Sequence, residues 1–390
     1  MTFEALPAIL ATGAVAAVLA YLLTPLAMRV ATRYGAIDEP DSGRRIHVRP
    51  IPRAGGLGVV VAFVVIGLLA LGLQWQTDLY ASGRPWELNR WLLEENEIIA
   101  VFGGAVLAAT FGFVDDKWQI RARWQFIFQL SLAAFAILLG LQILEINNPL
   151  EFLGGVFADD TLVFEGILAA LVTAVWIVGM INSINFIDGL DGLSTGVAII
   201  AALTLGFVSL GYQSSYQPMV ALLCAVFAGS LLGYLPWNFN PAKVFIGTTG
   251  VMVMGYLLAV LAILGSAKVA VALLILGVPI IDTFFIITRR LLSGHSPFTP
   301  DRGHIHHRLL DLGLSHRGVV LLIYTITAVL AVTSVILAGG SGPIYAFMAI
   351  VVASGIVLLL ITFRGPDEAL EATTYDSDAV APSADDGDDT

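Results

Sequence analysis

Five of the six histidines of the chain lie within one segment, His295 to His316, between two apolar stretches. The polar residues in the middle of this segment include Asp301, Arg302, His304, His306 and His307. A string of the form His-x-His-His resembles a set of zinc ligands, but no cysteine accompanies it. We therefore expect the imidazoles, together with Arg302, to donate hydrogen bonds to phosphate oxygens, with a zinc site as the alternative. His295 and His316, at the two ends, are expected to face solvent.

Asn182, Asn185, Asp188 and Asp191 recur every three residues in the segment NSINFIDGLDGLSTG. This spacing places them on one face of a helix, or around a broken helix that lines a cavity. Carboxylate and amide oxygens suit Mg²⁺, which keeps several waters and is usually shared with substrate phosphates. Because polar residues at membrane depth generally have a function, we favour a metal and substrate site over a purely structural hydrogen-bond cluster.

Asp115 and Asp116 follow another apolar stretch, where the end of a helix already carries negative partial charge. Two adjacent carboxylates at such a place repel each other, so they need a cation or a proton. They either position a magnesium ion or a phosphate group, or they pair with Lys117 and the arginines that follow it.

A basic cluster precedes the second apolar stretch, and its members are Arg44, Arg45, His47, Arg49 and Arg53. Gly55 and Gly56 follow it, and glycines at the start of a helix let the backbone approach a phosphate closely. The cluster either grips phosphates of a substrate or anchors the chain to lipid headgroups, and the sequence supports both interpretations equally.

The composition decides the class of protein that carries these residues. The 390-residue chain is 57% hydrophobic and only 13% charged, about half the charge density of a soluble domain. We therefore expect an all-α, polytopic integral membrane protein with no nucleic-acid partner. The single Cys224 excludes a disulfide framework. The first apolar stretch has no basic residue before it, so we expect a retained helix rather than a signal peptide.

About 20 apolar residues cross a bilayer, and this length predicts eleven membrane spans. They lie near residues 5–28, 54–74, 97–114, 124–142, 164–184, 193–211, 218–235, 249–265, 268–288, 319–338 and 344–363. Between two of them, the turn-like residues of 143–163 predict a small hairpin.

The positions of lysine and arginine predict the orientation of these spans. With eleven spans, 16 of the 19 basic residues fall in loops on one side, which should be cytoplasmic. This places the N-terminus outside and the C-terminus inside the cell. The net charge of −11 comes mostly from nine acidic residues of the last stretch. We expect a transmembrane catalytic domain over 1–364 and a disordered acidic cytoplasmic tail over 365–390.

Several motifs together resemble the polyprenyl-phosphate N-acetylhexosamine-1-phosphate transferases, in particular the branch that starts enterobacterial common antigen, O-antigen and teichoic-acid linkage units. The matching stretches are HVRPIPRAGG, Asp115-Asp116, NSINFIDGLDGLS, Pro279-Ile-Ile-Asp282 with Arg289-Arg290, and SPFTPDRGHIHHRLLDLG. The resemblance implies transfer of a sugar-1-phosphate, expected to be GlcNAc-1-phosphate, from a UDP-N-acetylhexosamine to undecaprenyl or another polyprenyl phosphate. UMP would be released, and the reaction would be the first membrane step of a cell-envelope glycan pathway at the cytoplasmic membrane.

The resemblance also implies roles for single residues. Catalytic roles fall to Asp115, Asp116, Asp188 and Asp191, with the first two as organisers of acceptor and metal. Substrate-binding roles fall to Arg53, Arg123, Asn182, Asp191, Arg302, His304, His306 and His307. Arg123 would lie near the lipid phosphate, whereas Arg302, His304 and His306 would hold the uridine diphosphate moiety. The metal, Mg²⁺ or Mn²⁺, would be bound by Asn185 and by the residue at position 248. A homodimer is also compatible with the sequence.

One residue departs from the family pattern. After Lys243-Val244-Phe245 the family usually has Gly-Asp-x-Gly-Ser, whereas this chain has Thr248 at the position of the aspartate. A neutral hydroxyl binds Mg²⁺ far more weakly than a carboxylate, so we expect reduced metal affinity and low turnover unless Asp116, Asp188 or Asp191 replaces the missing ligand. A catalytically impaired binder of UDP-sugar or lipid phosphate is therefore an alternative function. A transporter for lipid-linked sugars is a second alternative, which the gathering of charge at one membrane face disfavours.

Overall fold

The structure is a computed structural model of the chain, and it describes residues 6–39, 50–82, 93–154, 159–211, 217–265, 268–292, 304–338 and 341–363. Its residues form two compact units, 1–347 and 348–390. The first unit contains every described residue of the predicted site. The predicted boundary at residue 364 stays a prediction.

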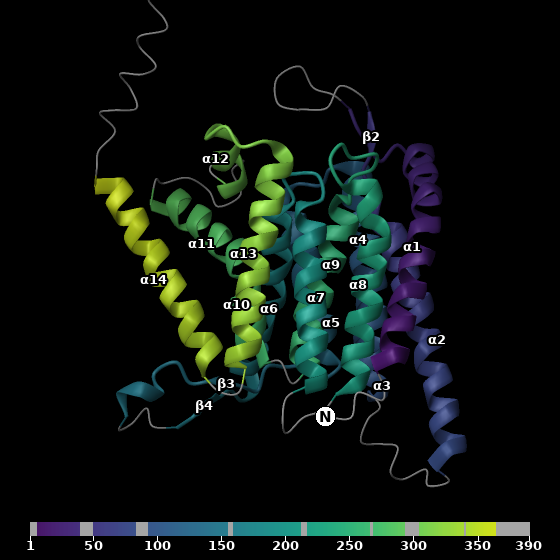
Figure 1. The fold of residues 1–390 in the computed structure, drawn as a ribbon, viewed down its shortest axis with the longest axis horizontal. Coiled ribbons are helices and arrows are strands. Elements are labelled where there is room, and N and C mark those ends of the chain that lie inside the picture. The colour runs from purple at the N-terminus through teal and green to yellow at the C-terminus, as the bar shows by residue number, and fades with distance from the viewer. Residues whose placement is uncertain are drawn as a thin grey trace, which may run out of the picture. The chain divides into compact units, whose positions relative to one another are not determined.

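The described residues form helices almost throughout (Figure 1). The helices are α1 (Leu6–Tyr34), α2 (Gly56–Ser82), α3 (Glu95–Ile98), α4 (Gly104–Trp118), α5 (Ala122–Leu138), α6 (Gly166–Ile187), α7 (Leu193–Gly211), α8 (Pro218–Asn238), α9 (Gly247–Leu264), α10 (Lys268–Ile275), α11 (Gly277–Leu292), α12 (Ile305–Asp311), α13 (His316–Leu337) and α14 (Gly342–Phe363). A π-helical turn, Ile99–Gly103, joins α3 to α4, and Glu151–Leu153 forms a 3-10 turn. The strands are β1 (Ile37–Asp38), β2 (Ile51–Pro52), β3 (Glu145–Asn147) and β4 (Thr161–Val163).

The predicted class, an all-α protein that crosses the membrane many times, is confirmed. In the described part of the chain, eight helices are long and apolar enough to span a bilayer. The predicted spans near 124–142 and 344–363 correspond to shorter apolar helices, Ala122–Leu138 and Gly342–Ser354. The number of eleven spans and the orientation of the termini therefore stay predictions.

The predicted span near 268–288 is divided into two helices that together are long and apolar enough to cross a bilayer, so its crossing as one span stays a prediction. Two helices, α10 and α11, meet here at an angle of 79°. Pro279 has no N–H to donate to the carbonyl of Ile275, so an unbroken ladder of helical hydrogen bonds cannot pass this point. Gly277 begins the second helix, and Pro279 lies in its first turn, where a missing N–H leaves no bond unmade. The break directs α11 toward α6, against which it packs.

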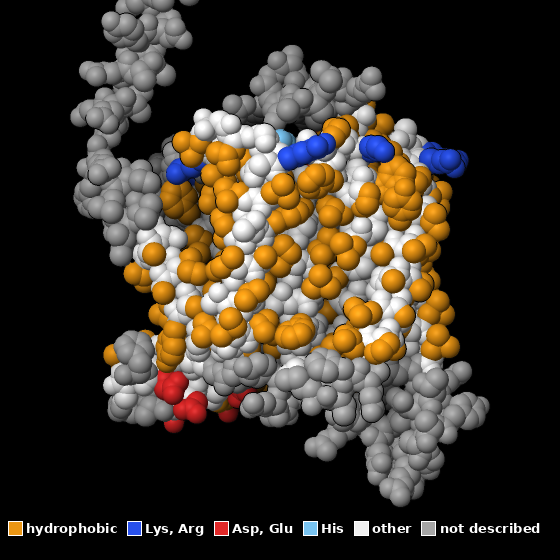
Figure 2. All heavy atoms as spheres, in the orientation of Figure 1, with side chains coloured by type: hydrophobic (Ala, Val, Ile, Leu, Met, Phe, Trp, Pro, Cys, Tyr) orange, Lys and Arg blue, Asp and Glu red, His pale blue; other side chains and the backbone are white. Residues whose placement is uncertain are grey.

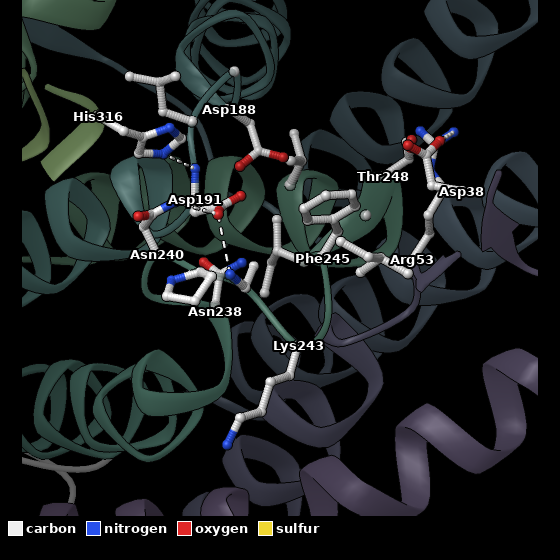
Figure 3. A pocket seen from close by; sticks show the side chains of 18 of the residues that line it. Asp38, Arg53, Asp188, Asp191, Asn238, Asn240, Lys243, Phe245, Thr248 and His316 are labelled. Carbon is white, nitrogen blue, oxygen red and sulfur yellow. Dashed lines mark hydrogen bonds and ion pairs between the residues drawn. The ribbon is translucent and has the colours of Figure 1, made fainter. Parts of the chain in front are cut away.

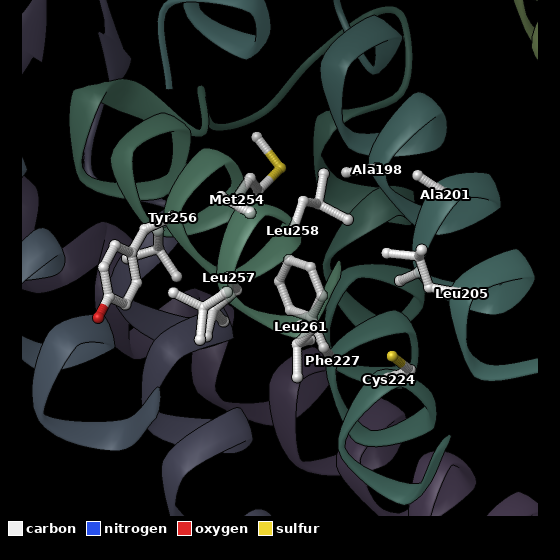
Figure 4. Packing of buried hydrophobic residues seen from close by; sticks show 14 of the residues in the cluster. Ala198, Ala201, Leu205, Cys224, Phe227, Met254, Tyr256, Leu257, Leu258 and Leu261 are labelled. Atoms are coloured by element: carbon white, nitrogen blue, oxygen red, sulfur yellow. The ribbon is translucent and has the colours of Figure 1, made fainter. Parts of the chain in front are cut away.

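Helix α9 is the centre of the unit. Nearly all of its side chains are buried, and it packs against α2, α4, α6 and α7. Leu257, Leu258 and Leu261 lie among side chains of α7 and α8 (Figure 4). Two buried aromatic side chains in and beside α9 have hydrogen-bond partners. The Tyr256 hydroxyl donates to the carbonyl of Ala100 at 2.8 Å, and the Trp176 indole donates to the carbonyl of Ala259 at 3.1 Å. A helix buried on all sides fixes the position of the residues at its N-terminus.

The two ends of the unit differ in charge. The β1–β2 hairpin and α12 lie at one end, and the β3–β4 hairpin lies at the other (Figure 1). On the face drawn in Figure 2, the described lysines and arginines gather at the β1–β2 end, and the described acidic side chains gather at the opposite end. The predicted hairpin within 143–163 is confirmed, because β3 pairs with β4 in antiparallel register.

Candidate active site

The hairpin β1–β2 and the start of α9 are locked together by backbone hydrogen bonds. Phe245 donates its N–H to the carbonyl of Pro52 at 2.9 Å, and Gly55 donates to the carbonyl of Phe245 at 3.0 Å. Gly247 has a φ of +69°, which favours glycine. A Cβ added there would lie 1.7 Å from the carbonyl oxygen of Arg53, so no other residue fits without a backbone shift. This contact holds the loop that carries Arg53 against the first turn of α9.

A cavity of about 850 Å³ opens beside this junction (Figure 3). Four distant parts of the chain line it: the β1–β2 hairpin, the turn between α6 and α7, the link from α8 to α9, and the helices α12 and α13. Its polar lining residues are Asp38, Arg53, Asn185, Asp188, Asp191, Asn238, Asn240, Lys243, Thr248, His307 and His316. Asp188, Asp191 and His316 lie on one side in Figure 3 and Asp38, Arg53 and Thr248 on the other, with Phe245 between them, whereas Lys243 points away.

The turn between α6 and α7 supplies two of the three carboxylates that line the cavity. Asp191 Oδ2 accepts hydrogen bonds from Asn240 Nδ2 at 2.9 Å and from the Ala242 N–H at 3.0 Å. The Asp188 carboxylate accepts from the Ser194 hydroxyl through its Oδ1 atom. Burial raises the pKa of Asp188 to about 7, against the opposing effects of the Ser194 hydrogen bond and of Arg53. A cation that reaches this turn would therefore meet a carboxylate with little stabilisation of its own negative charge.

Asn185 and Asn182, predicted to act together, separate in the structure. Asn185 lines the cavity. Asn182 does not: its Nδ2 donates to Gln129 Oε1 of α5 at 2.7 Å and to the carbonyl of Val178 at 2.8 Å. The predicted substrate role of Asn182 therefore has no direct support from this geometry, which instead shows a link between two helices inside the bundle.

Asp115 and Asp116 are buried behind the cavity rather than in its lining, with 5% and 2% of their surfaces exposed. Asp115 Oδ2 accepts from the Thr248 hydroxyl at 2.6 Å, and its Oδ1 accepts from Gln125 Nε2 at 2.8 Å and from the Ile120 N–H at 2.9 Å. Hydrogen bonds to a carboxylate stabilise its charge without a metal ion. Thr248 thus supplies Asp115 with a proton donor where a carboxylate at position 248 would supply a second negative charge.

Asp116 caps the start of α9 in a similar way. Its Oδ1 accepts from the Thr248 N–H at 2.7 Å, and its Oδ2 accepts from the Thr249 N–H at 2.9 Å and the Thr249 hydroxyl at 2.6 Å. Arg53 Nε lies 4.0 Å from Asp116 Oδ1. These donors belong to the first turn of a helix, where backbone N–H groups have no partner within the helix. The alternative partner, Lys117, lies instead over the rings of Trp118 and Tyr34.

The histidine segment contributes unequally to the cavity. His307 lines it, whereas His304 and His306 are buried beside it. The ring of His304 lies 2.8 Å, from Nδ1 to Oδ2, from Asp282 of α11. Burial lowers the pKa of His306 to about 3, so this imidazole is neutral at pH 7. Its ring packs against Gly189, where an added Cβ would lie 2.0 Å from His306 Nε2.

The remaining predicted residues are placed as follows. Arg53 lines the cavity, and its Nη1 lies 3.3 Å from Asp38 Oδ1. Arg123 is exposed on α5 with its guanidinium 5.7 Å from the centre of the Trp124 ring, and it does not line the cavity. Arg302 lies outside the described residues, as do His295 and the basic cluster from Arg44 to Arg49.

Sequence reasoning missed several residues of the cavity. His316, expected to face solvent, lines it, and its Nε2 accepts the N–H of Asp191 at 3.0 Å. Asn240 was also missed, although the proline that follows it, Pro241, favours a turn. Arg317 holds this turn by donating from Nε and Nη2 to the Asn240 carbonyl at 3.1 and 2.7 Å. These side chains come from elements that meet only in the folded chain.

Three side chains of the cavity have the chemistry to hold a divalent cation. Among the described residues, no three His, Cys, Asp or Glu side chains are grouped as metal ligands. Asp188 accepts the Ser194 hydroxyl with one carboxylate oxygen, and Asp191 accepts both donors of the α8–α9 link with one oxygen. The other oxygen of each carboxylate is therefore left for a ligand. Asn185 adds an amide oxygen to the same cavity. Mg²⁺ is usually bound by one or two carboxylates together with substrate phosphates. Asp188, Asp191 and Asn185 therefore suit it, whereas the Thr248 hydroxyl already donates to Asp115.

Comparison with known proteins identifies relatives of the chain. A family model described as glycosyl transferase family 4 matches residues 98–266. A probable undecaprenyl-phosphate N-acetylglucosaminyl 1-phosphate transferase of Bacillus subtilis is 34% identical over 81% of each chain. A decaprenyl-phosphate N-acetylglucosaminephosphotransferase of Mycolicibacterium smegmatis is 33% identical over 92% of this chain and 90% of its own length. An undecaprenyl-phosphate alpha-N-acetylglucosaminyl 1-phosphate transferase of Haemophilus influenzae is 30% identical over 80% of this chain and 83% of its own.

Proposed function

Because the chain belongs to glycosyl transferase family 4, we propose that it transfers N-acetylglucosamine-1-phosphate from UDP-GlcNAc to a polyprenyl phosphate and releases UMP. The relatives are named as transferases of this sugar phosphate to undecaprenyl or decaprenyl phosphate. Their names do not specify the donor; UDP-GlcNAc is the donor that the motif resemblance implies. Neither the non-catalytic binder nor the transporter receives support from these names.

One observation carries the proposal: a polar cavity lies at the basic end of an apolar helical bundle. A lipid phosphate held at the membrane surface and a water-soluble nucleotide can meet only at such a boundary. The lining combines one guanidinium, three carboxylates and amide groups. Phosphoryl transfer needs positioned charges around the diphosphate more than it needs covalent chemistry from the protein.

In the proposed reaction, an oxygen of the acceptor phosphate attacks the phosphorus that carries the sugar. The bond from that phosphorus to the bridging oxygen breaks, and UMP leaves with the bond's electrons. A phosphate monoester has a second pKa of about 6, so the acceptor is already largely ionised at pH 7. A general base is therefore not required. Arg53, whose guanidinium lies between Asp38 and Asp116, is suited to hold a phosphate oxygen of either substrate.

The acidic side chains divide into two roles in this proposal. Asp188, Asp191 and Asn185 contact the substrates and would hold Mg²⁺ or Mn²⁺. When bound, such an ion supplies positive charge to the diphosphate. Asp115 and Asp116 are positioning residues, because they hold the first turn of α9, which presents Thr248 to the cavity, without lining the cavity themselves.

The histidine segment would hold the nucleotide. His307 faces the cavity, and His304, His306 and Arg302 are proposed to contact the uridine diphosphate. We place the reaction at the cytoplasmic membrane, as the first membrane step of a cell-envelope glycan pathway, because a nucleotide sugar is supplied from the cytoplasm.

The experiment incubates the purified chain with undecaprenyl phosphate and radiolabelled UDP-GlcNAc or UDP-GalNAc, with and without Mg²⁺. We expect label in the lipid phase and an equal amount of UMP, with UDP-GlcNAc preferred. Asp191→Asn should abolish transfer, whereas Glu145→Gln, a substitution in β3 at the opposite end of the unit, should not change it. Lipid-linked label without UMP, or no transfer from either donor in the presence of Mg²⁺ or Mn²⁺, would contradict the proposal.

A further inference from the structure

A second cavity, of about 580 Å³, lies on the outer surface of the helical bundle. One face of α1 forms most of it, and its lining residues are Pro25, Met28, Arg29, Thr32 and Arg33 of α1, Pro52 of β2 and Trp237 of α8. The α1 residues recur at intervals of three and four, so they form one continuous strip. We call this cavity the α1 groove. It shares no lining residue with the candidate active site.

The α1 groove has a basic rim and an apolar floor. Arg29 and Arg33 are exposed and lie one helical turn apart, and no ion pair joins either of them to a described carboxylate. Lys243 does not line the groove, but its Nζ lies 5.2 Å from the centre of the Trp237 ring, which does. Pro25, Met28 and Trp237 supply the apolar surface. Two full positive charges beside an apolar surface match a ligand that carries both a phosphate and a hydrocarbon chain.

The surface that continues from the groove is also suited to such a ligand. Along α1 toward its N-terminus, Val18, Leu22 and Leu26 expose 61%, 64% and 54% of their surfaces. In a helix that spans a bilayer, side chains this exposed face lipid tails. An acyl chain can therefore follow α1 while its headgroup lies between the two arginines.

We propose that the α1 groove binds the phosphodiester headgroup of an anionic phospholipid. The polyprenyl phosphate acceptor is the other amphiphilic phosphate that this membrane would contain. The groove disfavours it as the site of reaction, because a phosphate bound there would be separated from Asp188 and Asp191 by the strand β2. The bound lipid is accordingly a structural ligand rather than a substrate.

Binding at this place has a consequence for the active site. Pro52 lines the groove, while its neighbours Ile51 and Arg53 line the catalytic cavity. The carbonyl of Pro52 also accepts the N–H of Phe245. A lipid that packs against Pro52 would therefore stabilise the strand that positions Arg53. This consequence rests on the proposed function, whereas binding of the lipid itself does not.

The test measures lipid binding and not turnover, so its failure is distinct from failure of the transferase proposal. The purified full-length chain is titrated with phosphatidylglycerol or phosphatidylcholine, and bound copies are counted by native mass spectrometry. Each basic residue near an anionic surface contributes about fivefold in affinity. We therefore expect the double substitution Arg29→Gln and Arg33→Gln to weaken phosphatidylglycerol binding about 30-fold and to leave phosphatidylcholine binding unchanged.

Two control variants make the outcome specific. Arg121→Gln removes an exposed positive charge at the start of α5, outside the groove, and should leave binding unchanged. Arg29→Lys with Arg33→Lys keeps both charges and should retain most of the affinity, which separates charge from misfolding. Equal phosphatidylglycerol affinity in the wild-type chain and the glutamine variant would overturn the proposal. Displacement of phosphatidylglycerol by equimolar undecaprenyl phosphate would also overturn it, because the groove would then be an acceptor site.

Discussion

Replacing Thr248 by aspartate tests how this chain stabilises its buried carboxylates. In the structure the Thr248 hydroxyl lies 2.6 Å from Asp115 Oδ2 and donates a hydrogen bond to it. An aspartate at this position would remove the donor and place a second negative charge at roughly 4 Å. With an effective dielectric constant of about 20, two like charges at that distance repel by about 4 kcal/mol. The lost hydrogen bond to a charged group adds about 2 kcal/mol.

We therefore expect Thr248→Asp to be less stable than the wild-type chain when divalent cations are removed. Its apparent melting temperature in detergent with EDTA should fall by roughly 5 °C. Millimolar Mg²⁺ should restore it, because the new carboxylate and Asp115 together attract a cation. The melting temperature of the wild-type chain should change much less on addition of Mg²⁺. UMP release should require less Mg²⁺ in the variant than in the wild-type chain.

Thr248→Asn is the matched control, because asparagine has the size of aspartate without its charge. It should melt at nearly the same temperature with EDTA and with Mg²⁺. Equal responses of the wild-type chain and Thr248→Asp to Mg²⁺, in both melting temperature and UMP release, would refute this explanation. Such a result would mean that the neutral hydroxyl at position 248 does not determine how strongly stability and UMP release depend on Mg²⁺.

Three further substitutions test other parts of the site. The pKa of Asp188 is raised to about 7, so a proton competes with a cation below that pH. The Mn²⁺ affinity of the wild-type chain, measured by electron paramagnetic resonance, should therefore rise from pH 6 to pH 7 and level off above pH 7.5. Asp188→Asn should bind Mn²⁺ weakly at every pH, and the same rise in that variant would contradict the assignment. Gly247→Ala should lower the free energy of unfolding by more than about 2 kcal/mol, because its Cβ clashes with the backbone. Gly313 has a φ of +89° but open space around it, so Gly313→Ala should lower the free energy of unfolding by only about 1 kcal/mol. Equal losses of the two variants in thermal melting would refute the packing argument. Asp282→Asn removes the charge that faces His304. It should raise the KM for UDP-GlcNAc about tenfold, with a smaller change in kcat. An unchanged KM would show that this contact does not position the nucleotide site.

The broad architecture follows from the sequence because it depends on local properties. Apolar stretches of membrane length predict helices wherever they occur, and eight of the described helices meet that requirement. The polar segment from Asn182 to Asp191 predicts a cavity, because polar residues are unfavourable in a membrane unless they line one. Asn185, Asp188 and Asp191 do line the cavity.

The details that could not be predicted depend on contacts between distant elements. The three-residue spacing treats Asn182 and Asn185 as equivalent, but α5 places Gln129 beside Asn182 and turns it inward. The His316 side chain lies against Asp191 because α13 packs on α7, which no local pattern reveals. Likewise, Gly277 and Pro279 occur in membrane helices with and without a break. Pro279 interrupts the helical hydrogen bonds, but the direction in which α11 leaves α10 depends on its packing against α6 and α13.

We propose above all that distant polar segments of the chain form one nucleotide-sugar site at the cytoplasmic membrane face. Sided cysteine labelling tests it most directly, with His307→Cys in the cavity and Glu145→Cys in β3 at the opposite end, each in a Cys224→Ala chain. We predict that a membrane-impermeant maleimide labels the cysteine of His307→Cys only in inside-out vesicles, and that UDP-GlcNAc protects this cysteine from labelling. The cysteine of Glu145→Cys should react only from the other side of the membrane, and UDP-GlcNAc should not protect it. Labelling of His307→Cys from the outside, or no protection by UDP-GlcNAc, would contradict the account.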